Sequence, residues 1–91
     1  MPSKTDMYLA AVEQAVSEPG QWIQIPRRFE SELNASVIGG CLRGGYLRVP
    51  PRDGDEAVEV DGRTYLKTAA PVTSRVDDVG GAWTLSIRYE D

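Results

Sequence analysis

The sequence predicts a small α+β domain, in which a mostly antiparallel sheet of about five to six strands carries one or two helices on one face. Three observations support this fold class. Apolar residues recur at helical spacing in the first half, Asp61-Gly62 separates two alternating segments, and the last segment alternates strictly. The length of 91 residues suits a single domain spanning 1–91. We expect residues 1–4 and 90–91 to be frayed.

The first predicted element is a helix over residues 5–17. Either Ser3 or Thr5 can cap its first turn, and Pro19-Gly20 ends it. Its apolar positions at helical spacing are Tyr8, Ala11, Val12 and Ala15. Because this stripe is narrow and rich in alanine, we expect the helix to dock on the outside of the domain or, alternatively, against a second copy.

Residues 21–26, QWIQIP, predict a short strand that ends at Pro26. Proline cannot donate a hydrogen bond to a neighbouring strand, so we expect an edge or near-edge position. Pro26 also suits the start of a helix, which we predict over residues 27–43 with Gly44-Gly45 as its C-cap. The apolar stripe of this helix consists of Phe29, Leu33, Val37, Ile38, Cys41 and Leu42.

Two glycines, Gly39 and Gly40, stand inside the second predicted helix. Together they cost about 1 to 2 kcal/mol relative to alanine, so they need a physical reason. Either another backbone approaches the helix closely there, or the helix ends near Ile38 and the glycines belong to a loop. We favour the close approach, because Cys41 and Leu42 continue the apolar stripe.

The segment EAVEVDGRTYLKT predicts a hairpin. Asp61-Gly62 suits a type I′ turn, in which both central residues need a positive φ. In this register Val58 lies opposite Tyr65, and Glu56 lies opposite Lys67, where their charges attract.

Residues 46–51 predict a further short strand, and residues 72–76 and 82–89 predict a second hairpin around DDVGG. The last strand is expected to have one face in the core and one in solvent. Its inward residues are Trp83, Leu85, Ile87 and Tyr89, and its outward residues are Thr84, Ser86 and Arg88.

Charge is distributed unevenly along the chain. Residues 1–19 have a net charge of −2, residues 20–52 of +3 and residues 53–91 of −5, for a total of −4. A basic middle between acidic ends can present a positive face to an anionic partner or support self-association. The negative total weakens any long-range attraction to nucleic acid.

Histidine is absent, and Cys41 has no second cysteine with which to form a disulfide. The usual general base near neutral pH and the commonest metal ligand are therefore missing, and we expect no enzyme activity, no cofactor and no metal. An enzyme would need another arrangement, such as a cleft lined by carboxylates. No long apolar run suggests a signal peptide or membrane span, so we expect a cytoplasmic protein.

Two motifs lack residues that their usual functions require. GGCLRGGY has the glycines of a phosphate-binding loop, but Gly45-Tyr46 stands where Lys and Ser or Thr are needed. DGDEAVEVDG has the acids of a calcium loop, but a loop that starts at Asp53 puts Val58 at the glycine position and Thr64 at the bidentate position. A helix C-cap and a solvated acidic turn explain them better.

The segment LRGGYLRVP resembles the small excisionase and MerR-like winged-helix families, in which a recognition helix ends in glycine before a short strand. The resemblance implies that Arg43, Arg48 and Arg52 contact phosphates and that the Asp61-Gly62 hairpin is the wing. A broader pattern is similar to small proteins of actinobacteria and their phages, and it implies no activity. Its residues are Trp22, Ile25, Pro26, Gly44, Pro50, Arg88 and Tyr89.

These observations favour a non-enzymatic interaction module that binds a protein partner or a second copy. Nucleic-acid binding is the alternative, and we expect neither a membrane nor a small-molecule substrate. The contact surface is expected to combine the glycine-dented helix with neighbouring arginines. Its candidate residues are Arg27, Arg28, Gly39, Gly40, Arg43, Arg48 and Arg52.

Overall fold

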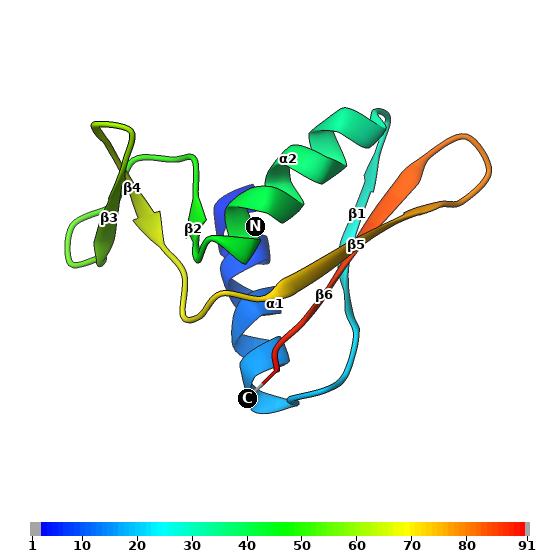
Figure 1. Ribbon diagram of the computed structural model, residues 1–91, viewed down its shortest axis with the longest axis horizontal. Helices are drawn as coiled ribbons and strands as arrows, with labels where there is room; N and C mark the ends of the chain where they lie inside the picture. The colour runs from blue at the N-terminus through cyan, green and yellow to red at the C-terminus, as the bar shows by residue number, and fades with distance from the viewer. Residues whose placement is uncertain (1–2, 91) are drawn as a thin grey trace.

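The computed structural model describes residues 3–90 (Figure 1). It confirms the α+β class, with two helices and six strands in this part of the chain, although the strands form two three-stranded antiparallel sheets. Sheet A has the order β1-β6-β5 and sheet B the order β2-β4-β3. The elements are α1 (Lys4–Ser17), β1 (Ile23–Phe29), α2 (Glu32–Arg43), β2 (Tyr46–Leu47), β3 (Ala57–Val60), β4 (Arg63–Lys67), β5 (Thr73–Asp78) and β6 (Trp83–Arg88).

Helix α1 forms as the sequence predicts. The Ser3 hydroxyl accepts a hydrogen bond from the backbone N–H of Asp6, which caps the first turn. The predicted stripe is buried in the domain's own core, so α1 docks on the domain. Lys4 is the first helical residue. Residues 1, 2 and 91, on which the expected fraying also falls, lie outside the described residues.

The boundary between β1 and α2 differs from the prediction. Strand β1 continues past Pro26 to Phe29, and α2 begins only at Glu32, after Ser31 caps it. Pro26 is tolerated because the pairing with β6 is irregular between Gln24 and Arg28, so its missing N–H removes no regular bond of the ladder. Phe29 is therefore a buried strand residue and not part of the helix stripe.

The core of the domain lies between sheet A and the two helices. Its fully buried members include Val12 of α1, Leu42 of α2, and Leu85 and Ile87 of the central strand β6. Burial of such side chains is the main favourable term in folding. This layer fixes the direction of α2 relative to the sheet.

Gly39 and Gly40 both lie in α2, and only one of them is at a close approach. A Cβ atom on Gly39 would stand 2.9 Å from the Ser74 Oγ atom and 3.2 Å from a Leu85 methyl group, so side chains of β5 and β6, and not another backbone, occupy the space beside this glycine. Gly40 points away, with nothing within 4 Å. The helix ends at the predicted Gly44-Gly45, where Gly45 has a φ of +81°.

The predicted apolar stripe of α2 is wrong at Leu33 and Val37. Both side chains are exposed, whereas the buried positions of the helix are Ala35, Gly39, Cys41 and Leu42. The buried side combines the small Ala35 and Gly39 with the fully buried Leu42. Leu33 and Val37 lie on the opposite side of the helix and face outward.

Sheet B is a smaller unit beside this core. Asp61 and Gly62 have φ values of +51° and +79°, which confirms the predicted turn with two positive angles. Val58 pairs with Tyr65, and Lys67 lies 3.2 Å from the Glu56 carboxylate, as the register requires. Strand β2 has only two residues.

The face of sheet A that turns away from the helices is also covered. Thr84 and Ser86 alternate with Leu85 and Ile87 and thus point to the other side of the sheet, as predicted. They are nevertheless buried rather than solvated. Both have long polar neighbours across the strands, and these are Gln24, Arg28, Arg75 and Asp77.

Candidate interaction surface

The outer side of α2 carries an exposed apolar stripe. Leu33 and Val37 are 71% and 41% exposed, and Gly40 has open space where a side chain would be. Their spacing of four and three residues puts them on one side of the helix, which we call the α2 stripe. A projecting leucine and a bare glycine on the same side give this surface a knob and a hollow.

Two opposite charges lie along one side of the α2 stripe, near the two ends of the helix. Glu32 stands in the first turn of the helix and Arg43 in the last turn, where each suits the helix dipole. At about 100° per residue, the eleven-residue separation places both on the same flank. Neither forms an ion pair within the part of the chain that the structure describes.

The candidate arginines are spread over several elements. Arg27 donates to the hydroxyl of Tyr8 on α1, and its guanidinium carbon lies 4.4 Å from the centre of the Phe29 ring. Arg28 lies across from Thr84 on the outer face of sheet A. Arg27 is thus held by the domain itself, while Arg28 belongs to another surface than the α2 stripe.

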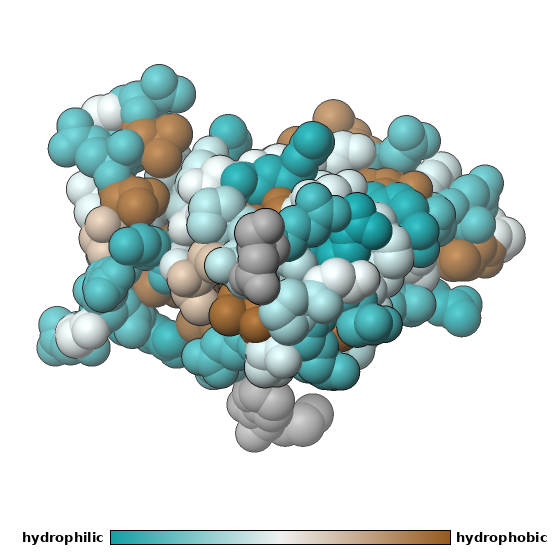
Figure 2. All heavy atoms as spheres, turned by 60° about the horizontal axis from the view of Figure 1, so that its bottom comes forward, coloured by the Kyte–Doolittle hydropathy of each residue, from teal (hydrophilic) through white to brown (hydrophobic). Residues whose placement is uncertain are grey.

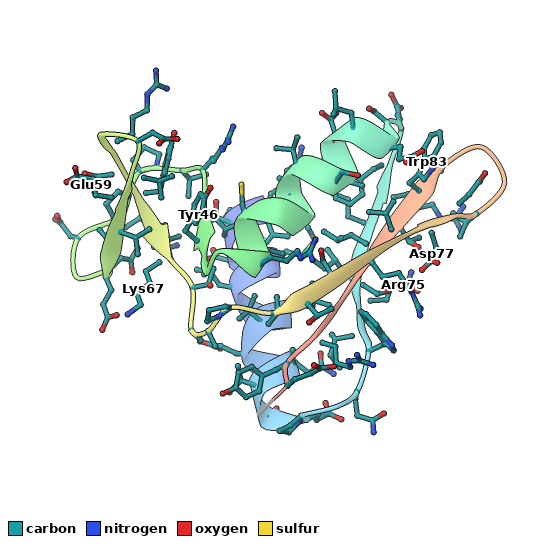
Figure 3. The ribbon with its side chains drawn as sticks, viewed as in Figure 1. Tyr46, Glu59, Lys67, Arg75, Asp77 and Trp83 are labelled. Atoms are coloured by element: carbon teal, nitrogen blue, oxygen red, sulfur yellow. The ribbon has the colours of Figure 1, made fainter. Side chains whose placement is uncertain are left out.

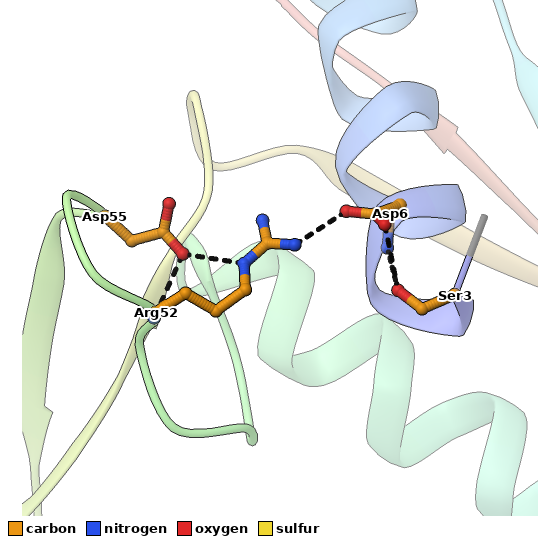
Figure 4. A network of polar contacts seen from close by, with 4 residues as sticks. All are labelled: Ser3, Asp6, Arg52 and Asp55. Atoms are coloured by element: carbon orange, nitrogen blue, oxygen red, sulfur yellow. Dashed lines mark hydrogen bonds and ion pairs between the residues drawn. The ribbon is translucent and has the colours of Figure 1, made fainter.

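Arg52 connects the loop before β3 to the start of α1 (Figure 4). Its guanidinium lies 2.8 Å from the Asp6 carboxylate and 2.9 Å from that of Asp55. Hydrogen bonds from Arg52 lower the pKa of both carboxyl groups, and Ser3 adds to the effect at Asp6. The pKa of Arg52 is raised in turn. This arginine therefore ties sheet B to α1.

Arg48 lies beside two stacked tyrosines. A hydrogen bond with Tyr46 raises the pKa of Arg48. The rings of Tyr46 and Tyr65 lie 5.7 Å apart at an angle of 15°.

Of the candidate residues, Gly40 and Arg43 belong to the exposed side of α2. Gly39 is buried beside Ser74 and Leu85 and is not accessible to a partner.

A second group of arginines, not among the predicted contact residues, lies on the outer face of sheet A. The guanidinium carbons of Arg75 and Arg88 each lie 4.5 Å from the centre of the Trp22 ring. Arg75 also pairs with Asp77 at 3.0 Å, and Figure 3 shows both side chains extending from β5 away from α2. The hairpin register, combined with the outward position of Arg88, could have identified this group.

A cleft of about 390 Å³ opens between α1 and sheet B, and three carboxylates line it. Asp55 is already held by Arg52, and Glu56 pairs with Lys67, leaving Glu13. The lowered pKa of Asp55 makes it a poor proton donor near neutral pH. The cleft fits the expected feature of an enzyme in composition, but two of its three carboxylates are neutralised.

The face of the molecule that Figure 2 shows is mainly polar. In the view of Figure 2, hydrophilic side chains cover most of the face, and hydrophobic ones form small, separate groups. Over residues 3–90, no group of three or more His, Cys, Asp or Glu residues could hold a metal ion. No helix in the described chain is long and apolar enough to cross a membrane.

Comparison of the chain with protein-family models, with curated proteins and with solved structures finds no match in any of the three.

Proposed function

We propose that the protein is a non-enzymatic, protein-binding module that uses the α2 stripe as its contact surface. The observation that carries this proposal is the outward position of Leu33 and Val37 beside the bare Gly40. The side of α2 that packs on the core is the opposite one, which holds Ala35 and Gly39. Leu33 and Val37 are therefore not part of the core. An apolar helix face next to a hollow is the surface that a partner helix covers.

Nucleic-acid binding is the alternative, and the geometry gives it less support. A recognition helix presents polar side chains to base edges and phosphates. The exposed side of α2 instead has Leu33, Val37 and Gly40 along its middle, and Arg43 is the one basic residue of the helix. The hairpin in the place of a wing has acidic residues at Glu56 and Glu59, and Arg52 is engaged by Asp6 and Asp55.

Site-specific cross-linking tests the proposal. A photoreactive residue at the exposed Ser36, on the flank of the α2 stripe, should give an adduct with a polypeptide in an extract of the cells that make the protein. The same residue at the exposed Gln21 serves as the control position. Equal adducts at the two positions would contradict the proposal.

A matched pair of valines supplies the second control. Val37 and Val79 are 41% and 40% exposed, but Val79 lies in the loop between β5 and β6. Val37→Glu should abolish the adduct at position 36, because a charge in an apolar contact must be desolvated. Val79→Glu should leave the adduct intact. If both substitutions act alike, the α2 stripe is not the contact surface.

A further inference from the structure

We propose that the occupant of the α2 stripe is a second copy of this chain, which docks its own α2 antiparallel about a two-fold axis near Val37. This inference rests on the proposed function and narrows it from protein binding to self-association. Its basis is that the stripe is complementary to itself in shape and in charge.

The complementarity in shape comes from Leu33 and Gly40. A two-fold axis between residues 36 and 37 sets Leu33 of one copy opposite Gly40 of the other, and the reverse pair follows by symmetry. Leu33 projects into solvent, and Gly40 has nothing within 4 Å of the place of its missing side chain. Each leucine can therefore enter the hollow of the other helix, while the two copies of Val37 meet near the axis.

The complementarity in charge comes from Glu32 and Arg43. Because both lie on the same flank of the stripe, and because equal flanks meet in an antiparallel two-fold pair, Glu32 of one helix faces Arg43 of the other. Their levels along the axis differ by two residues, or about 3 Å, which two long side chains span. A parallel pair would instead bring the two acidic ends together and the two basic ends together.

Both charges are available for this contact. Glu32 and Arg43 are exposed and have no ion pair within residues 3–90. Two symmetric pairs at the rim would fix the direction and register of the helices more than they add to affinity. The apolar contact at the centre would supply most of the affinity.

Sedimentation of the purified chain over about 5 µM to 1 mM tests the proposal, a range that suits a small interface. The mass should rise with concentration from that of one chain toward that of two. Gly40→Leu places a side chain in the hollow, where a Cβ atom would have nothing within 4 Å, and it should raise the dissociation constant about tenfold or more. The same enlargement at an exposed position of α1, Ala10→Leu, should leave the constant within about twofold.

Charge reversal tests the antiparallel arrangement. Glu32→Arg and Arg43→Glu should each raise the dissociation constant several-fold, since each puts like charges opposite one another. The double variant exchanges the two charges and should return the constant to within about twofold of the starting value. Circular dichroism of each variant confirms that it is folded before its mass is measured.

Three outcomes would overturn the inference. The first is a mass of one chain at every concentration, and the second is a Gly40→Leu variant that dimerises as tightly as the unchanged chain. The third is a double charge-reversal variant whose dissociation constant is as high as that of the weaker-binding single variant. If the purified chain stays monomeric while the cross-linker at position 36 captures a different polypeptide, the proposed function stands and self-association fails. If no adduct forms at position 36 either, both fail.

Discussion

The two sheets of this domain differ in how they are held. In sheet A the central strand β6 has four consecutive buried residues, and both helices pack on it. In sheet B the strand β3 has no buried residue, and only Leu47 and Leu66 reach the core. The difference indicates that the stability of the domain resides mainly in sheet A and the helices, while sheet B depends on a few tethers to that unit.

The largest expected contrast is between a fully buried side chain of sheet A and a half-buried one of sheet B. Leu85→Ala in β6 should lower the free energy of unfolding by about 2 to 5 kcal/mol, because it leaves a cavity in a fully buried site. Val58→Ala in β3 should cost less than about 1 kcal/mol, because the side chain is half-buried and lies opposite Tyr65 in a strand with no buried residue. Denaturant titrations measure both, and equal losses would show that β3 contributes as much to the stability of the fold as β6.

The two neighbouring glycines of α2 should respond with opposite signs. Gly39→Val should lower the free energy of unfolding by about 1 to 3 kcal/mol, because its side chain would overlap Ser74 and Leu85. Gly40→Ala should raise it by about 0.5 to 1 kcal/mol, since alanine is the better helix former and meets no other atom.

Thermal or denaturant unfolding at a concentration that keeps the chain monomeric separates this effect from self-association. Each glycine serves as the control for the other, because they are adjacent in the same helix. A loss of stability at both positions would mean that the outer side of α2 is covered within the monomer.

The sequence predicted the β3–β4 hairpin, the strand β6 and the start of α1 well because their signals are local. The Asp61-Gly62 turn, the alternation of β6 and the cap at Ser3 each depend on residues close together in the chain. The start of α2 was missed because Pro26 suits both a helix start and an irregular strand, and only the pairing of β1 with β6 decides between them.

The candidate surface was predicted in part, for the same physical reason. Gly40 and Arg43 lie where a contact surface on α2 is expected, but the apolar spacing could not show that Leu33 and Val37 face outward. Which side of a helix is buried depends on how it packs against the sheet. In α2 the buried side is the one with Gly39, against which the Ser74 and Leu85 side chains pack. The pairing of Arg27 with Tyr8 and of Arg52 with Asp6 could not be predicted, because these contacts join segments that are far apart in the chain.

The smallest expected effect is at the tether between sheet B and α1. The pKa values of Asp6 and Asp55 are lowered in the folded chain, so their interaction with Arg52 stabilises the fold above the unfolded carboxyl pKa of about 3.9 and is lost as pH falls through the lowered folded values. Arg52→Gln should therefore lower the denaturant midpoint slightly at pH 7 and less at about pH 3, which lies below the unfolded carboxyl pKa of about 3.9, so that part of this stabilisation is lost. Arg28→Gln, which removes an arginine without an ion pair among the described residues, should show no such dependence on pH. A loss for Arg52→Gln of the same size at both pH values would mean that the arginine acts through packing, and that sheet B is held to α1 by more than charge.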